Sequence, residues 1–272
     1  FCITERPLVL SPSTFGIPQI RERIYILGIR NSIKDTSKLS NGFIHVDDLN
    51  LDGHYKRVEL FDAMQILDKN VSDKYFISSE QEEVIEAWEE FRLATKIGVV
   101  GYPIWLRYFG LDIDDETEFK KQLIPHSTPK WKENYIVKNR LLYTQNREFI
   151  DHWVKKHSML GRIKLFQKFE WNCGSQISTI KDAIIQIRQS GIRAKLPTYF
   201  PSLVAMNNTP IVWDKSKEKY RRITPFEAAK LQSFQPNIKF IGSDNQIYSQ
   251  LGNSVNVKVI QFIAENLFTL EQ

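Results

Sequence analysis

The C-terminal stretch 221–267 constrains the fold most, because it carries two helix signals on either side of a polar loop. Its first signal, Thr224–Glu227 (TPFE), has the form of a capping box. In such a box the threonine hydroxyl accepts from the backbone N–H of Glu227, and the glutamate reaches back to the threonine N–H. Pro225 suits the first helical position. We therefore predict a helix that begins at Pro225 and ends near Phe234.

A second helix is predicted to begin after the turn Gly252-Asn253-Ser254. Apolar side chains follow this turn at helical spacing, so one face of the helix should be buried. They are Val255, Val259, Ile260, Ile263 and Leu267. A turn that opens a helix leaves N–H groups unpaired, which suits a carboxylate or a phosphate. Spacing alone thus indicates two helices with a possible anion site. A simple C-terminal helical cap explains the apolar face equally well, but not the polar loop.

The N-terminal 31 residues are typical of two strands joined by a turn. Residues 7–11 form a short apolar run, and residues 23–29 are β-branched and continuously apolar, which is typical of a strand buried on both faces. Between them, Gln19, Arg21 and Arg23 alternate and should lie on one side of an extended segment. On spacing alone, we interpret these three as a charged strand entrance exposed to water.

The balance of charged residues changes from acidic to basic in the middle of the chain. Residues 80–119 hold eleven acids against three Lys or Arg, and residues 130–170 hold ten Lys or Arg against four acids. The acidic part predicts an amphipathic helix over 80–96 with a solvated outer face; its inner face is Val84, Ala87, Trp88, Phe91 and Leu93. The basic part interleaves aromatic residues, a pattern that fits either a nucleic-acid surface or amphipathic helices with aromatic cores. For individual aromatic residues we favour the core.

Two further patterns precede the C-terminal stretch. Isoleucines at 177, 180, 184 and 187 have helical spacing and predict a helix that ends at Ser190-Gly191. Residues 191–201 (GIRAKLPTYFP) then predict a stiff, basic loop bounded by prolines.

The composition indicates the class of protein and its cellular compartment. Hydrophobic residues make up 42% of the 272-residue sequence and charged residues 25%, which is typical of a globular protein with a sizeable core. The net charge of +5 permits a polyanionic partner without identifying one. Two cysteines indicate a reducing, intracellular compartment, and no apolar run reaches the length needed to span a membrane. Because the sequence starts at Phe1, we expect it to be part of a longer protein.

Two separated blocks resemble one family. RRITPFEAAKLQSF, followed by Gln246-x-Tyr248-x-QLGNSV (residues 250–255), resembles the last two conserved blocks of the DNA cytosine-5 methyltransferases. FGIPQIRERIYILGIRN (residues 15–31) resembles the family's eighth block, Gln-x-Arg-x-Arg before a core strand. The loop 191–201 is similar to the end of the target-recognition region in a subgroup. The blocks stand in the family's order, separated by a long variable region.

The resemblance implies a fold. We expect a partial Rossmann-like α/β methyltransferase domain, made of residues 1–31 and 222–272, with an antiparallel hairpin at the edge of a mostly parallel sheet. The helix after Gly252 should pack on that same sheet. Residues 32–221 should form a smaller target-recognition domain that binds double-stranded DNA, with the acidic surface of 80–119 facing away from it.

The resemblance also implies a reaction. Members flip the target cytosine out of the duplex. A cysteine thiolate then adds to C6, a glutamate binds N3, and C5 takes a methyl group from S-adenosyl-L-methionine. The Pro-Cys-Gln and Glu-Asn-Val blocks and the glycine-rich cofactor loop are absent from this sequence. Cys2 (Phe-Cys-Ile) and Cys173 (Trp-Asn-Cys-Gly) lack the family context, so we assign neither a catalytic role.

We therefore expect the C-terminal portion of a restriction-modification methyltransferase, inactive alone, whose N-terminal half lies on the same or a separate chain. The resemblance also implies a bacterial protein that is cytoplasmic or associated with the nucleoid. By resemblance, Arg23 holds the cytosine O2, Arg21 stabilises the pocket wall and Gln19 supports the turn. The cofactor pocket is closed by Asn253, Ser254 and Val255. DNA contacts are expected from Arg193, Lys195, Thr198, Tyr199, Arg221 and Arg222. The alternative is a module that only positions DNA, but such a module has no need of an arginine for cytosine O2.

Overall fold

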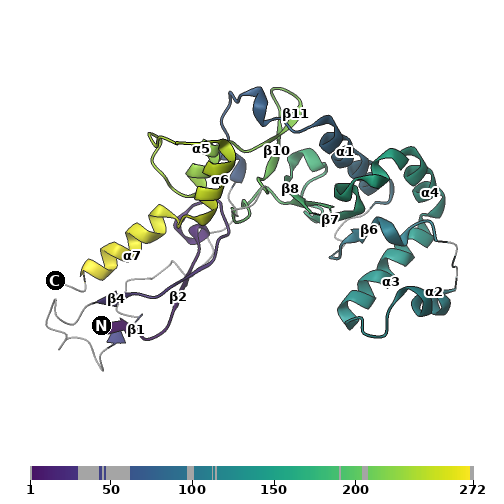
Figure 1. Ribbon diagram of the computed structural model, residues 1–272, viewed down its shortest axis with the longest axis horizontal. Coiled ribbons are helices and arrows are strands. Elements are labelled where there is room, and N and C mark those ends of the chain that lie inside the picture. The colour runs from purple at the N-terminus through teal and green to yellow at the C-terminus, as the bar shows by residue number, and fades with distance from the viewer. Residues whose placement is uncertain are drawn as a thin grey trace. The chain divides into compact units, whose positions relative to one another are not determined.

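The computed structural model describes residues 2–29, 43–44, 46, 62–96, 101–111, 113, 115–189, 191–203 and 208–269, which form two compact units (Figure 1). Unit 1 comprises Phe1–Ser72, Pro197–Thr209 and Ile223–Gln272, and unit 2 comprises Asp73–Leu196 and Pro210–Arg222. Residues 62–72 and 197–203 thus lie in unit 1, outside the boundaries expected for the catalytic part. Both units combine helices and strands, which confirms the α/β class.

Unit 1 begins with short paired strands. They are β1 (Cys2–Thr4), β2 (Leu8–Leu10), β3 (Arg23–Tyr25), β4 (Gly28–Ile29) and β5 (Phe43–Ile44). β2 pairs with β3 and β1 pairs with β4, both antiparallel, while β5 pairs parallel with β1. A 3₁₀ turn, η1 (Pro12–Phe15), follows β2. The predicted antiparallel hairpin is therefore confirmed, and we call β1–β4 the N-terminal hairpin.

Among the described residues, packing covers one face of the N-terminal hairpin. Leu8, Leu10 and Leu27 are buried in one cluster with Val259 and Ile263 of the C-terminal helix α7 (Val257–Thr269), which lies beside the hairpin in Figure 1. The predicted packing of this helix on the hairpin is therefore confirmed. The prediction of a strand buried on both faces is wrong, because alternate residues of a strand point to opposite faces and Ile24 and Ile26 are 68% and 66% exposed.

Two further helices complete unit 1, α5 (Pro225–Leu231) and α6 (Asp244–Asn253). The Thr224–Glu227 capping box forms as predicted, with both reciprocal hydrogen bonds, at 2.6 and 3.1 Å. The helix ends three residues earlier than predicted. A helix does follow the Gly-Asn-Ser turn, since α7 begins at Val257, but the turn does not open it, because Gly252 and Asn253 are the last residues of α6.

The missed helix α6 had its own signal. Ser243 and Gln246 form a second capping box, with the Ser243 N–H donating to the Gln246 side chain at 2.8 Å. The apolar stripe of α7 consequently begins later than predicted. Val255 precedes the helix and is 47% exposed, and Ile260 is 38% exposed, whereas Val259 and Ile263 are buried.

Unit 2 is built on a six-stranded sheet of order β11-β10-β8-β9-β7-β6. β7 and β9 run parallel, and the other neighbours are antiparallel. The strands are β6 (Ile104–Trp105), β7 (Lys168–Asn172), β8 (Ile184–Arg188), β9 (Gly191–Lys195), β10 (Ile211–Asp214) and β11 (Lys219–Arg222).

Two predictions fail at this sheet. Residues 184–188 form the strand β8 rather than the end of a helix, since isoleucine-rich runs also suit a strand that is hydrogen-bonded on both sides. The first half of the predicted loop, Gly191–Lys195, is the strand β9, which pairs with both β8 and β7. The predicted boundary before Gly191 agrees with the end of β8 at Arg188 and the start of β9 at Gly191, but both neighbouring elements are strands and not the predicted helix and loop.

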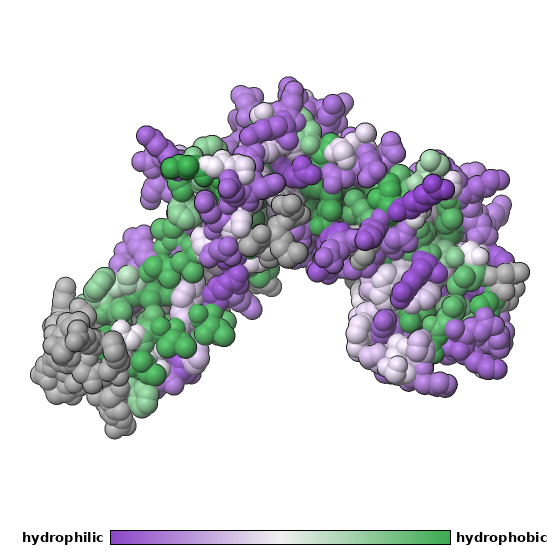
Figure 2. Space-filling model, viewed as in Figure 1, coloured by the Kyte–Doolittle hydropathy of each residue, from purple (hydrophilic) through white to green (hydrophobic). Residues whose placement is uncertain are grey.

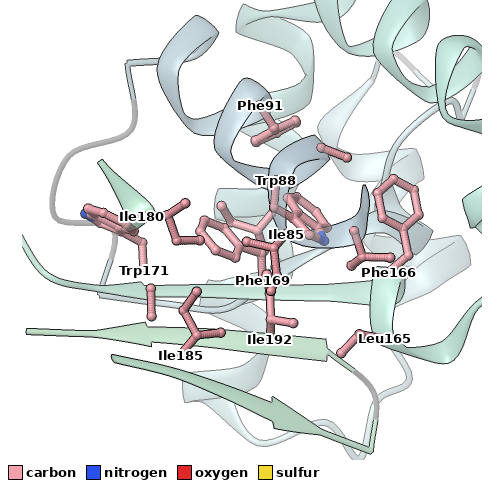
Figure 3. Packing of buried hydrophobic residues seen from close by; sticks show 14 of the residues in the cluster. Ile85, Trp88, Phe91, Leu165, Phe166, Phe169, Trp171, Ile180, Ile185 and Ile192 are labelled. Carbon is pink, nitrogen blue, oxygen red and sulfur yellow. The ribbon is translucent and has the colours of Figure 1, made fainter. Parts of the chain in front are cut away.

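Helices pack on this sheet and around it: α1 (Ser79–Ala94), α2 (Glu116–Leu123), α3 (Lys130–Gln145) and α4 (Arg147–Lys156). Short 3₁₀ turns η5 (Ala63–Ile66, in unit 1), η6 (Asp73–Tyr75), η7 (Leu106–Tyr108), η8 (Ser158–Arg162), η9 (Lys164–Gln167) and η10 (Ile180–Asp182) connect the elements. Figure 3 shows Trp88 of α1 next to Phe169 of β7, and the two rings are stacked; Phe91 belongs to the same buried cluster and contacts Trp88. The predicted inner face of α1 is confirmed except for Leu93, which is 57% exposed.

The aromatic residues of the basic stretch are mostly core, as favoured on the sequence. Tyr143, Trp153, Phe166 and Phe169 are buried, and Trp131 is exposed. In the part of the chain that the structure describes, no helix has the length and apolar character needed to cross a membrane.

Candidate functional site

Gln19 joins the entrance of the N-terminal hairpin to the segment 197–203 of unit 1. Its side chain is fully buried, and its Nε2 lies 3.4 Å from the Pro201 carbonyl oxygen. Backbone bonds on both sides reinforce this contact, because Phe200 donates to Pro18 O at 2.7 Å and Ile20 donates to Phe200 O at 3.1 Å. The predicted exposure of this segment to water is therefore wrong for Gln19.

Arg21 is the most highly connected side chain at this place. It is 3% exposed, and its guanidinium donates at 2.6 Å to Leu203 O and at 3.1 Å to Ser202 Oγ. On the other side it donates at 2.6 Å to Gly252 O and at 2.7 Å to Ser254 O. One guanidinium, with donors in a fixed planar fork, thus ties three segments of unit 1 together.

The end of α6 explains why a cation lies there. The carbonyl groups of the last helical turn have no partner within the helix and carry partial negative charge. Gly252 and Ser254 present two of these oxygens to Arg21. The predicted anion site at a helix N-terminus is therefore wrong, because the turn offers carbonyl oxygens instead of N–H groups.

Arg23 differs from Arg21 although the two residues are only two positions apart. Its side chain is exposed at the start of β3, and its guanidinium donates to the backbone oxygen of Glu22 at 2.7 Å. Burial raises the pKa of the nearby Tyr25, while the charges of Arg23 and Arg21 oppose this rise. Arg21 is fixed inside the unit, and Arg23 lies at its surface.

The residues predicted to close a cofactor pocket lie at the end of α6. Asn253 is exposed, and Val255 is 47% exposed. The Ser254 hydroxyl donates to Leu251 O at 2.8 Å, so it is engaged locally. The polar groups that remain accessible at this turn therefore include the Asn253 amide.

Asn256 was missed on the sequence. It is 2% exposed, its Nδ2 donates to Leu231 O at 3.0 Å, and its Oδ1 accepts from the N–H of Val259 at 3.3 Å and from Ser233 Oγ at 3.1 Å. It thereby starts α7 and fastens that helix to the end of α5. An asparagine just before an apolar periodic run is a helix-start signal that was available in the sequence.

Arg193 and Lys195 lie on β9 and are partly buried. The Arg193 guanidinium contacts the carboxylate of Glu170, which Lys168 also approaches at 2.8 Å. Burial alone would raise the pKa of Glu170, but hydrogen bonds from these two cations outweigh it and lower the pKa. Arg193 therefore has an ion-pair partner within unit 2.

The remaining predicted DNA contacts are divided between the units. Arg221 is 2% exposed, and its Nε lies 3.2 Å from Asp214 Oδ2, so its guanidinium is directed into unit 2. Arg222 is partly buried. Thr198 and Tyr199 are partly buried in unit 1.

Cys173 is a poor nucleophile in this fold. It is 1% exposed, and burial raises the pKa of its thiol to about 12, against the opposing charge of Arg92. The thiolate is the reactive form of cysteine, so Cys173 is almost entirely unreactive at neutral pH.

Comparison with known proteins identifies related type II methyltransferases. The chain is 32% identical over 289 aligned residues to the type II methyltransferase M.BanI of Aneurinibacillus aneurinilyticus, a match that covers 96% of this chain and 62% of M.BanI. It is 32% identical over 146 residues to the type II methyltransferase M.AluI of Cellulosimicrobium cellulans, covering 52% of this chain and 26% of M.AluI. The chain therefore spans less than two thirds of the length of these relatives.

Among solved structures, that of a Spodoptera frugiperda DNMT2 mutant is 16% identical, with a TM-score of 0.43, and the alignment covers 98% of this chain and 58% of that one. The family model for the C-5 cytosine-specific DNA methylases matches residues 5–269, nearly the whole sequence. This match takes in the segment of Gln19, Arg21 and Arg23, the sheet of unit 2 and the end of α6. The chain belongs to the C-5 cytosine-specific DNA methylase family.

Proposed function

We propose that this chain is the C-terminal portion of a DNA (cytosine-5-)-methyltransferase of a restriction-modification system, which acts on a flipped cytosine in a specific duplex site. The observation that carries the proposal is the Arg21 guanidinium. It joins the Gln-x-Arg-x-Arg segment to the end of α6, so that two family blocks more than two hundred residues apart meet in unit 1.

In this proposal Arg23 holds the cytosine O2. Negative charge accumulates on the base as a thiolate adds to C6, and a permanently charged guanidinium stabilises that charge. The exposed position of Arg23 leaves its donors accessible to a flipped base. Arg21, which is enclosed by four hydrogen bonds, keeps the backbone leading to Arg23 in place, and Gln19 holds the preceding turn.

The end of α6 fits part of a cofactor pocket. The exposed Asn253 amide can exchange hydrogen bonds with a polar nucleoside edge, and the half-exposed Val255 offers methyl groups to an apolar one. We therefore assign Asn253 and Val255 to S-adenosyl-L-methionine, which supplies the methyl group when it is bound. Ser254 contributes through its backbone, because its hydroxyl is engaged with Leu251 O.

For DNA we propose unit 2 as the main part of the recognition domain. Lys195, Arg193 and Arg222 are its candidate contacts to phosphates. Thr198 and Tyr199, which belong to unit 1, are separate candidate contacts. Because Arg221 is 2% exposed and contacts Asp214, we assign it the support of β11 and not a phosphate contact.

The nucleophile is proposed to lie outside this chain. Cys173 is buried with a raised pKa, and the Pro-Cys-Gln block is absent from the sequence. The chain alone should therefore transfer no methyl group. A complementing portion of the enzyme that carries the nucleophile, the N3 carboxylate and the cofactor loop should restore activity.

Reconstitution tests this proposal. The chain is mixed with the portion of M.BanI that lies outside the matched region, and labelled methyl transfer to duplex DNA is measured. Arg23→Ala should lower kcat by about 10²–10³ with little change in the Kd for DNA, since loss of one donor to developing charge typically costs that much.

Glu22→Ala is the matched control, because it keeps the backbone oxygen that Arg23 contacts, and it should retain activity. Equal activity of Arg23→Ala and Glu22→Ala would contradict the assigned role. If the pair forms and binds DNA but transfers no methyl group, the chain is instead a recognition module that only positions DNA.

A further inference from the structure

Four aromatic side chains of unit 2 reach the surface at α3 and β6. Trp131 is 59% exposed, and Tyr102, Trp105 and Tyr135 are partly exposed. Figure 2 shows a pale area of intermediate hydropathy, bordered by hydrophilic residues, over the part of unit 2 that contains α3 in Figure 1. We call these four residues the aromatic surface.

The four rings are in contact through Tyr135. The centroid of its ring lies 5.6 Å from that of Trp131, 6.2 Å from that of Tyr102 and 6.4 Å from that of Trp105. The contact with Trp131 is T-shaped. Because more than half of the Trp131 side chain is exposed, much of the indole remains available to stack on another ring.

A small core next to this surface holds α3 in place. Its buried members are Tyr108, Phe119 and Ile136, and Trp105 packs against them. In addition, the fully buried Asn139 of α3 accepts at its Oδ1 from the backbone N–H of Trp105 at 2.7 Å. Trp131 belongs to neither contact, so the packing of unit 2 does not account for an indole at this position.

Cations lie beside the aromatic surface. Lys138 Nζ lies 5.5 Å from the centroid of the Tyr102 ring, and the guanidinium carbon of Arg107 lies 5.7 Å from that of Trp105. Both cations are exposed. The stretch 130–140 holds four Lys or Arg against one acid, Glu133. Accessible rings bordered by positive charge fit a ligand that has both flat rings and negative charge.

The form of nucleic acid follows from what the rings can reach. In a duplex the bases stack on one another and present only their edges in the grooves, whereas an unpaired base offers its face. The chain belongs to a family of DNA methylases, which makes DNA the polynucleotide at hand. We propose that the aromatic surface binds single-stranded DNA, with Trp131 stacked on one base and Lys138 beside a phosphate. This inference goes beyond the proposed function, because it involves neither the flipped cytosine nor S-adenosyl-L-methionine.

Binding of a labelled oligo(dT) of about 12 nucleotides to the intact chain tests the proposal, since site sizes for single strands are of this order. Fluorescence anisotropy measures the Kd. Trp131→Ala should raise it about tenfold or more, because the substitution removes the partner of one stacked base. Trp131→Phe keeps an aromatic face and should stay within about threefold of the unmodified chain.

A second variant tests the phosphate contact. Lys138→Ala should reduce the slope of log K against log salt by about 0.7, the value for one contact to a single strand. Phe226→Ala is the matched control for the tryptophan. Phe226 lies in unit 1, is 51% exposed and has a T-shaped partner in Phe240, so its loss should leave the Kd within about twofold.

Each other outcome would overturn the inference. An unchanged Kd for Trp131→Ala would show that the indole does not contact the strand. Duplex DNA that loses as much affinity as oligo(dT) on this substitution would assign the surface to the duplex. Oligo(U) that binds about tenfold more tightly than oligo(dT) would assign it to RNA, in which the 2′-hydroxyl is recognised. A proline-rich peptide that loses binding with Trp131→Ala, while oligo(dT) does not, would assign it to a protein partner. These measurements need no methyl transfer, so their failure leaves the proposed function untouched.

Discussion

The core of unit 2 and the N-terminal hairpin of unit 1 differ in how completely their apolar side chains are buried. In unit 2 the ring of Trp88 lies 5.1 to 5.6 Å from those of Trp153, Phe166 and Phe169, and all four side chains are buried (Figure 3). In the hairpin, one side of the sheet is packed against α7 and the other side leaves Ile24 68% exposed.

This difference indicates how each of the two regions is stabilised. Unit 2 buries a large aromatic cluster with residues of its own, and aromatic side chains contribute much of the burial energy of a core. The hairpin satisfies only half of its apolar surface with residues that the structure describes. We therefore expect unit 2 to be stable by itself and the hairpin to gain order from a partner.

The largest effect should come from the centre of unit 2. Trp88→Ala removes a fully buried indole from the aromatic cluster and should lower the free energy of unfolding by about 3–5 kcal/mol. Ile24→Ala is the counterpart on the exposed face of the hairpin and should cost less than about 1 kcal/mol. Urea unfolding of the two variants measures this contrast. Equal losses would show that the hairpin is packed on both sides.

A similar contrast exists within unit 1 between its two neighbouring arginines. Arg21→Ala leaves the carbonyl groups of Leu203, Gly252 and Ser254 without their donor and should cost about 2–3 kcal/mol. Arg23→Ala removes an exposed side chain and should change the free energy of unfolding by less than about 0.5 kcal/mol. Thermal or urea unfolding distinguishes them. A loss of stability with Arg23→Ala as great as with Arg21→Ala would contradict the separation into a fixed and an accessible arginine.

The smallest effect concerns DNA binding by unit 2. If Arg193 and Lys195 contact phosphates, each replacement by Ala should reduce the slope of log K against log salt by about one. The ion pair of Arg193 with Glu170 should make the change at Arg193 the weaker of the two. Lys121→Ala, at an exposed site in α2, should leave the slope unchanged. An unchanged slope for the Arg193→Ala, Lys195→Ala double variant would remove β9 from the DNA surface.

Structural features that depend on interactions within a few residues were predictable from the sequence. The capping box at Thr224 and most of the inner face of α1 follow from neighbouring side chains alone, whereas the antiparallel pairing of the hairpin was implied by the family resemblance. The second capping box, at Ser243, is equally visible in the sequence, although this stretch was predicted to be a polar loop. The isoleucines at 184 and 187 fit a strand or a helix equally well, and only pairing with β9 and β10 decides between them.

The burial of the candidate site residues could not be predicted from local sequence patterns. Gln-x-Arg-x-Arg predicts three polar side chains on one edge, but not that Gln19 and Arg21 are buried and Arg23 is exposed. Their burial depends on carbonyl oxygens of residues 201–203 and 252–254, which are distant in sequence. For the same reason Asp214, the partner of Arg221, gave no signal in the sequence.

Hydrogen exchange of the backbone amides tests the central claim most directly, since it reads both regions in one sample. In the chain alone, amides of β2 and β3 should exchange at least about tenfold faster than those of β7, β8 and β9, because the described residues pack on one side of the hairpin only. Adding the complementing portion of M.BanI should slow exchange in β2 and β3 and leave β7–β9 unchanged. Hairpin amides that are already as protected as β7–β9 in the chain alone, and that do not respond to the added portion, would contradict the account.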